Sequence, residues 1–250
     1  MDDIIELLDK ECGQDPETVL MVHRGKTYDY MEIAINYNTK GKVVFTMVEY
    51  IQDVLDESLE ELHGQSETPA ANHLFDVDKY SKKLNKEYGS IFHHLVAKLL
   101  YLPKRARSDI QKYVSFLCTQ MREPDIYDWK KLQLTIRYPK ATRWLPLTLE
   151  ADETMISKWW IYSSYGVHED HRVHTGGTIS LGKGHPYSTS SKQKLNTRSS
   201  TESKLVGIDD LMPMLLWTPL FMEAHGYDMK DNILYQDNKI TMLLDNSRKA

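Results

Sequence analysis

The spacing of apolar residues changes near Leu149, and this change constrains the fold more than any other feature of the sequence. Before Leu149, apolar residues recur every three or four positions, which predicts helices over 86–102, 108–121 and 125–138. Pro103 and Pro139 are expected to end the first and the last of these helices. After Leu149, β-branched and aromatic residues predict strands over 157–167, 174–181 and 186–190. A helical unit followed by a sheet is therefore expected.

The C-terminal part then alternates between helix and strand. A long helix is predicted over 200–225, a strand over 232–236 and a further helix from near Asn238. Pro213 and Pro219 are expected to kink or divide the long helix, because proline lacks the backbone donor. Residues 182–184 (Gly-Lys-Gly) are expected to form a turn between two strands. The predicted order is β-β-β-α-β-α, which is an α/β arrangement.

The N-terminal part combines short helices with a small antiparallel sheet. Helices are predicted over 2–11 and from Val48 to Gly64, and strands over 18–23, 28–37 and 42–46. Residues 64–71 have no periodicity and contain a Thr-Pro pair, which is typical of a linker. The sequence therefore divides into a first unit of 1–63, a linker of 64–84, a helical connection of 85–149 and an α/β unit of 150–250.

The composition is typical of a soluble globular protein. The chain has 250 residues, of which 41% are hydrophobic, and this is enough for a substantial core. Its longest apolar runs are short and interrupted, and Met1 precedes two aspartates, so neither a membrane span nor a secretion signal is expected. Cys12 and Cys118 are far apart, which argues against a disulfide framework or a zinc site. We expect an intracellular location, in the cytoplasm or the nucleus.

Two motifs have a chemical interpretation that their context does not favour. Residues 177–183 (GTISLGK) match seven positions of a phosphate-binding loop, but the flanks predict strands and Gly184 replaces the required hydroxyl residue. A hairpin turn is the favoured interpretation. Asp209 and Asp210 resemble a polymerase pair, but they lie in a helical pattern and are predicted to be solvated charges.

The histidines also allow more than one interpretation. His168, His171 and His174 are spaced three apart, and imidazole is a common metal ligand. Because this spacing suits a helix rather than a loop, we favour polar histidines beside a nucleic-acid groove over a metal site. The adjacent histidines at 93–94 diverge on a helix and cannot easily share one ion.

Several segments together resemble the reverse transcriptase and ribonuclease H region of copia-type retrotransposon polyproteins. They occur in the family order at 29–33 (DYMEI), 68–75 (TPAANHLF), 93–102 (HHLVAKLLYL), 104–110 (KRARSDI), 128–132 (DWKKL), 158–160 (KWW), 174–177 (HTGG), 180–184 (SLGKG), 188–196 (STSSKQKLN), 199–205 (SSTESKL) and 235–238 (YQDN). The resemblance implies a fragment that starts downstream of the polymerase aspartates. It would comprise the palm end with a small α+β thumb-like unit, a helical connection and a C-terminally truncated, ribonuclease H-like mixed sheet.

The resemblance also assigns catalytic positions. In the family, four carboxylates hold two Mg²⁺ ions that cut the RNA strand of an RNA–DNA hybrid. Tyr162 stands at the first acid position, Lys204 at the second and Asp237 at the third, and the fourth lies beyond Ala250. A phenol and an ammonium group are poor ligands for a hard cation. We therefore expect no metal and no cofactor, and an ion pair between Lys204 and Asp237.

Glu202 is a tempting substitute for the lost acid, but it lies on a different side of the helix from Lys204. Ser199 and Glu202 fit a capping box at the start of the long helix, and we favour that role over metal binding. Asp237 is also placed to cap the helix predicted after it. In the N-terminal part, Glu32 stands where the family has a turn glycine, which should cost local stability.

Four functions remain open from the sequence. An inactive fragment of a copia-type reverse transcriptase and ribonuclease H explains the most residues. A retained module for an RNA–DNA hybrid or single-stranded nucleic acid is the second. It would use basic residues from the acid-free stretch 171–201, namely Arg172, Lys183, Lys192, Lys194 and Arg198. Weak ribonuclease H activity through Glu202 and Asp237 is the third, and an interaction protein built from the helices between 86 and 138 is the fourth.

Overall fold

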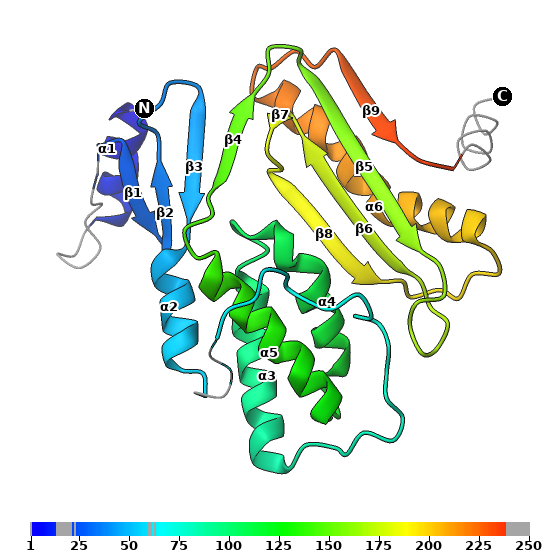
Figure 1. The fold of residues 1–250 in the computed structure, drawn as a ribbon. Coiled ribbons are helices and arrows are strands. Elements are labelled where there is room, and N and C mark those ends of the chain that lie inside the picture. Colours follow the sequence, from blue (N-terminus) through cyan, green and yellow to red (C-terminus); the bar gives the residue numbers. More distant parts are fainter. Residues whose placement is uncertain (1, 14–21, 23, 60–61, 63, 239–250) are drawn as a thin grey trace.

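The computed structural model describes residues 2–13, 22, 24–59, 62 and 64–238, which form a mixed α/β structure with two sheets. The strands of the first sheet are, in spatial order, β1 (Thr27–Tyr30), β2 (Ile33–Asn36), β3 (Lys42–Thr46), β4 (Leu147–Ala151) and β7 (Gly182–Lys183). Those of the second are β8 (Tyr187–Lys192), β6 (His174–Ser180), β5 (Ile156–Ser164) and β9 (Asp231–Tyr235). Figure 1 shows both sheets above a group of helices. The α/β class expected from the sequence is confirmed.

The first hairpin of the antiparallel first sheet differs from the prediction. The strand predicted over 28–37 is two strands, because Met31 and Glu32 have φ angles of 50° and 62° and turn the chain back. Two residues in the left-handed region form a turn whose twist matches antiparallel strands, although glycine, asparagine or aspartate usually occupies it. The strand predicted over 18–23 lies outside the described residues except for Val22.

The helices predicted before Leu149 are confirmed. They are α3 (Lys86–Tyr101), the short 3₁₀ helix η2 (Ser108–Ile110) with α4 (Gln111–Gln120), and α5 (Ile126–Ala141), while α2 (Val48–Asp56) follows the first sheet. The side chain of Asp125 caps α5 by accepting the backbone N–H of Asp128 at 3.0 Å. α5 continues past Pro139, because one missing backbone bond in the last turn does not unwind it. The apolar faces of these helices form the largest core cluster.

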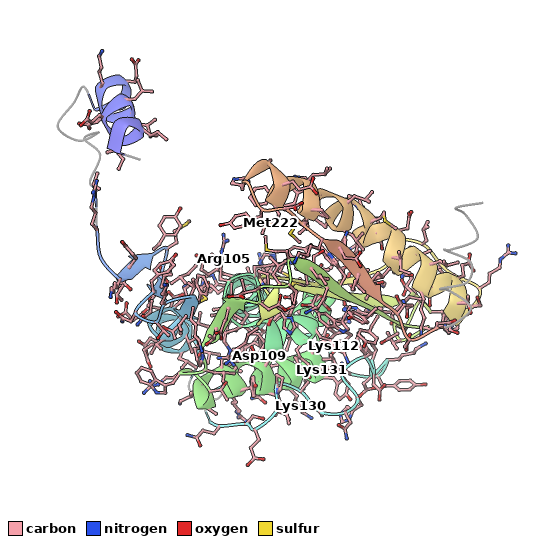
Figure 2. The ribbon with its side chains drawn as sticks, turned by 90° about the horizontal axis from the view of Figure 1, so that it is seen from above. Arg105, Asp109, Lys112, Lys130, Lys131 and Met222 are labelled. Carbon is pink, nitrogen blue, oxygen red and sulfur yellow. The ribbon has the colours of Figure 1, made fainter. Side chains whose placement is uncertain are left out.

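The N-terminal helix is present as predicted, but its apolar face does not pack. α1 (Asp2–Cys12) exposes Ile4, Leu7 and Leu8 to between 46% and 60%. Figure 2 shows α1 apart from the rest of the chain. It therefore contributes nothing to the core that holds the sheets.

The second sheet has the arrangement expected of the α/β unit. β5 pairs antiparallel with β6, and β6 pairs antiparallel with β8, whereas β5 pairs parallel with β9. The helix α6 (Ser200–Ala224) connects β8 to β9, so the order β-β-β-α-β is observed, with the two-residue β7 added before β8. The helix predicted from near Asn238 lies outside the described residues.

The predicted turn at 182–184 also joins the two sheets. Gly182 and Lys183 form β7, which pairs antiparallel with β4. The close approach requires glycine, because a Cβ atom on Gly182 would lie 2.3 Å from the carbonyl oxygen of Glu150, and the φ angle of Gly182 is 148°. The phosphate-binding interpretation is wrong, since residues 177–183 run through β6 and β7 and no helix follows them.

α6 is neither divided nor ended by its two prolines, contrary to one of the predicted outcomes. Pro219 lacks the N–H that would bond to the carbonyl oxygen of Leu215. The side chain of Asn232 in β9 donates to that oxygen instead, at 2.8 Å. Asn232 in turn accepts a hydrogen bond from the hydroxyl of Ser157 in β5. The sheet thus satisfies the backbone group that Pro219 leaves without a partner.

α6 is more apolar than its interrupted sequence suggested. In the described part of the chain it is the one helix that is long and apolar enough to cross a membrane, by length and composition only. It packs on the second sheet through Ile208, Leu211 and Leu215, which are buried against strand residues. Its charged pair, Asp209 and Asp210, is exposed as predicted. The fold therefore uses α6 to cover a sheet.

α4 covers the free edge of the second sheet at β8. Gln111 donates to the backbone oxygen of Ser188 at 3.1 Å, and the hydroxyl of Ser115 donates to the backbone oxygen of Ser190 at 2.7 Å. An uncovered edge strand would leave such oxygens open to pairing with another chain. Figure 2 shows α6 and the helices α3 to α5 on opposite sides of the second sheet.

Candidate functional site: an ion pair at inferred acid positions

Lys204 and Asp237, which stand at two of the inferred acid positions, form an ion pair. Lys204 lies at the start of the second turn of α6, and its Nζ atom lies 2.5 Å from Oδ1 of Asp237, just after β9. The lysine side chain is 15% exposed and the aspartate side chain 53%. The pairing expected from the sequence is confirmed. The carboxylate of Asp237 thus already has a cation bound to it, and the chain itself supplies that cation.

Neighbouring bonds hold Asp237 beside β5. The side chain of Gln236 donates to the backbone oxygen of Ile161 at 3.3 Å and accepts the backbone N–H of Asp237 at 2.8 Å. Because β9 runs parallel to β5, this fixes the segment after β9 next to the C-terminal part of β5. Lys204 approaches the same point from α6. The pair therefore sits where two adjacent strands and a helix meet.

Tyr162 lies on the neighbouring strand but faces away from α6. Trp159 and Ile161 are buried against α6, so the alternation of side chains places Tyr162 on the opposite face of the sheet. Its register partner is Gly176, and its side chain is 55% exposed. Within the described residues, the tyrosine makes no hydrogen bond to Lys204 or Asp237. The structure therefore brings together two of the three inferred positions, and the third lines a cavity on the other face.

These side chains do not fit the two Mg²⁺ ions that the family resemblance implies. Two ions about 4 Å apart need several shared carboxylates. Here an ammonium group contacts the one carboxylate, and a phenol stands at the first position. In the described part of the chain, no three His, Cys, Asp or Glu side chains are close enough to hold a metal. What the described residues form at this point is an ion pair.

The start of α6 is capped much as predicted. The hydroxyl of Ser199 accepts the backbone N–H of Glu202 at 3.1 Å. Glu202 reaches back to the backbone N–H of Arg198 at 2.6 Å, one residue before the cap residue that a standard capping box would use. Its carboxylate also lies in the first turn, where the helix dipole favours a negative charge. Glu202 is therefore engaged at the helix terminus.

The five basic residues proposed for nucleic-acid contact do not form one patch. Lys192 and Arg172 both approach Oδ2 of Asp170, at 2.7 Å and 3.5 Å. Burial would raise the pKa of Asp170, but its bonds to Lys192 and to the backbone of Arg172 lower it overall. Lys183 lies away from them on β7, in the first sheet. Lys194 and Arg198 are exposed before α6, and no ion pair involves either among the described residues. Asp170 falls just outside the acid-free stretch, which is why the sequence did not reveal this neutralisation.

His168 and His174 are buried, and not the solvent-exposed loop histidines that the sequence suggested. Both are about 95% buried, and Nε2 of His168 lies 3.0 Å from Nδ1 of His174. Nε2 of His174 lies 2.7 Å from the hydroxyl of Ser190. The ring of Phe75 packs against both histidines, with ring centres 5.2 and 5.1 Å away. Burial lowers the pKa of His168 to about 4 and that of His174 to about 3.

In the part of the chain that the structure describes, neither His171 nor the adjacent pair at 93–94 belongs to a group that could hold a metal. His171 is exposed and has a φ angle of 59°, so the chain turns there and separates it from the buried pair. His93 and His94 are exposed on α3, and Nε2 of His94 lies 3.0 Å from a carboxylate oxygen of Glu57. Among the described residues, the three predicted histidines therefore do not converge on one point.

The sequence is 27% identical over 171 residues to a protein of Saccharomyces cerevisiae named for the transposon Ty5-1. The chain is related to a transposon protein. The match covers 68% of this chain and 54% of the yeast protein, so the chain spans about half the length of that relative. No family model matches the sequence.

Sequence reasoning missed the features that depend on packing between distant segments. The histidine pair is buried only because Phe75 and α4 lie against β6 and β8. A cavity on the sheet face that carries Tyr162 likewise needs α4 as its second wall. One indication of this cavity wall was present in the sequence, namely the alternation that places Trp160, Tyr162 and Ser164 on a single face of the predicted strand.

Proposed function

We propose that the chain is a fragment of a copia-type retrotransposon reverse transcriptase and ribonuclease H region, and that its ribonuclease H site is inactive. The similarity to a Ty5-1 transposon protein and the β-β-β-α-β order of the second sheet support the origin. The main support for the loss of activity is the 2.5 Å ion pair between Lys204 and Asp237. A divalent ion would have to displace an ammonium group from the carboxylate it needs, without help from other acids.

The test is cleavage of the RNA strand of an RNA–DNA hybrid with Mg²⁺. We expect the wild-type chain to show no cleavage above the level of an Asp237→Asn variant. A Lys204→Glu variant removes the ammonium group from Asp237 and restores the inferred acid beside it, so it should bind Mg²⁺ more tightly than the wild type, as measured by calorimetry. Magnesium-dependent cleavage by the wild type that Asp237→Asn abolishes would overturn the proposal. Cleavage unchanged by Asp237→Asn would indicate a contaminating nuclease.

Two of the other candidate functions have less support. Residual activity through Glu202 needs a free carboxylate, but this one accepts the backbone N–H of Arg198. An interaction protein built from the helical segment needs an exposed apolar face, whereas the apolar faces of α3, α4 and α5 form the main core. For nucleic-acid binding through the predicted basic residues, Lys183, Lys194 and Arg198 are left to contact phosphate. Arg172 and Lys192 are both paired with Asp170.

A further inference from the structure

Two adjoining cavities form a groove between α4 and the face of the second sheet that α6 leaves uncovered. The larger has a volume of about 380 Å³ and lies between the start of α4 and strands β5, β6 and β8. The smaller has a volume of about 240 Å³ and lies beside residues 103–106. The cavities share Ser108, His185 and Ser188. We call the two together the α4 groove.

One wall of the α4 groove is aromatic. Tyr162 is 55% exposed and lines the larger cavity together with Trp160. Trp160 stacks on Tyr235 of β9, with ring centres 5.2 Å apart and planes within 14°. Gly176 stands opposite Tyr162 in the register, and its missing side chain leaves room beside the tyrosine ring. Exposed rings next to open space on a sheet are suited to stacking against a flat ligand.

The other wall is basic. Lys112 lines the larger cavity, and Lys104 and Arg105 line the smaller one. All three are exposed, and neither cavity has an acidic residue in its lining. Figure 2 shows Lys112 on the side of the second sheet away from α6. The groove therefore presents positive charge on one side and aromatic rings on the other, and it suits a ligand that is both anionic and aromatic.

The walls are held together before any ligand binds. Gln111, next to Lys112, donates to the backbone oxygen of Ser188 and accepts from its hydroxyl at 2.5 Å. Ser190 contacts His174 through its hydroxyl and Ser115 through its backbone oxygen. Because these bonds fix α4 against β8, the distance between the two walls is set by the fold. A preformed site loses less conformational entropy on binding.

We propose that the α4 groove binds a phosphate-bearing nucleobase ligand, with the base stacked at Tyr162 and the phosphate near Lys112, which lines the same cavity. The ligand is either a free nucleotide or a segment of single-stranded nucleic acid. The inference goes beyond the proposed function, because the groove lies on the opposite face of the sheet from α6 and does not require cleavage. It uses none of the five basic residues that the sequence suggested.

Fluorescence titration of the full chain tests the proposal, since Trp160 reports on the groove. The probes are a mononucleotide, a single-stranded oligonucleotide of about ten residues, a length within the usual range for such sites, an RNA–DNA hybrid, and inorganic polyphosphate as a charge-only ligand. Tyr162→Ala should weaken oligonucleotide binding about tenfold, as expected for the loss of one stacked base. Tyr162→Phe should bind as the wild type does. Lys112→Ala should weaken binding and reduce the salt dependence by about one phosphate contact.

Matched controls are an exposed tyrosine and an exposed lysine outside the groove. Tyr165→Ala and Lys130→Ala should leave binding unchanged, because neither residue lines the groove. A mononucleotide that saturates as tightly as the oligonucleotide would identify the free nucleotide as the ligand. Polyphosphate binding as tight as that of the oligonucleotide, or equal losses from Lys130→Ala and Lys112→Ala, would overturn the proposal. The proposal would also be overturned if neither Tyr162→Ala nor Tyr162→Phe changed the affinity for the oligonucleotide.

Discussion

At the scale of single residues, Glu32 occupies a backbone conformation that suits glycine. Its φ angle of 62° lies in the left-handed region, where a side chain costs roughly 1–2 kcal/mol. Glu32→Gly should therefore raise the free energy of unfolding by about 0.5–1 kcal/mol, after the greater flexibility of glycine in the unfolded chain is deducted. Urea denaturation followed by circular dichroism measures the change.

Asp29→Gly is the matched control, because Asp29 lies three residues earlier in β1 and has no positive φ angle. Glycine inside a strand loses conformational freedom without relieving strain, so this variant should lower stability by about 0.5–1 kcal/mol. If both variants lower stability equally, the left-handed conformation of Glu32 carries no strain.

At the scale of secondary-structure elements, the sequence revealed those with a strong local pattern. α3 begins where the apolar repeat predicted it and ends within one residue of the predicted end, and β5, β6 and β8 lie within the predicted strands to within a few residues. β4 and β7 were missed because both are short and their pairing partners lie far away in the chain. The turn at Met31 and Glu32 was missed because neither residue is a usual turn former.

The candidate site divides in the same way. Lys204 and Asp237 could be paired in advance, because the resemblance placed both at one site and their charges are opposite. The cap at Ser199 follows a local rule and was also predictable. The partners of Lys192 and the burial of His174 were not, since both depend on how a loop and α4 fold over β6 and β8.

α6 offers a prediction at the element scale, concerning how it tolerates Pro219. Asn232→Ala should lower the free energy of unfolding by about 1–3 kcal/mol, because it removes the donor to the buried carbonyl oxygen of Leu215. In a Pro219→Ala background the new backbone N–H can bond to that oxygen. The same Asn232→Ala change should then cost less. Urea denaturation of the four proteins gives the coupling.

A cost of Asn232→Ala that is identical in both backgrounds would contradict this account. It would mean that Asn232 stabilises the fold only through its bond to Ser157, which both backgrounds retain. Asn232→Asp separates the two bonds further, since a carboxylate can accept from Ser157 but cannot donate to Leu215.

At the scale of the whole molecule, the helical segment and the second sheet are joined through buried polar and aromatic contacts. His168 and His174 lie in this interface between Phe75 and Ser190. Burial lowers the pKa of both histidines, so both are neutral near pH 7. The charge of Lys192 lowers the pKa of His168 further, and that of Lys112 lowers the pKa of His174 further. Asp170 acts in the opposite direction and raises the pKa of His168. Protonating either ring therefore loosens the contact between the two parts.

This arrangement predicts a loss of stability in acid. The folded-state pKa values, about 4 and about 3, lie below the ordinary value of 6.5, so the unfolded chain binds more protons below about pH 6.5. The free energy of unfolding should fall as the pH drops from 6.5 toward 4, by up to about 1.4 kcal/mol per pH unit for each histidine. Asp128 has the opposite sign, because burial raises its pKa to about 6.

Comparing variants isolates the histidines from Asp128, which all of them share. His168→Phe keeps an aromatic ring beside Phe75 and Phe116. It should reduce the slope of the unfolding free energy against pH, between pH 6 and pH 5, by the amount that corresponds to about one bound proton. His93→Phe, at an exposed position on α3, should leave the slope unchanged. Urea denaturation at several pH values measures both. Equal slopes for His168→Phe and the wild type would show that acid weakens the molecule elsewhere than at this interface.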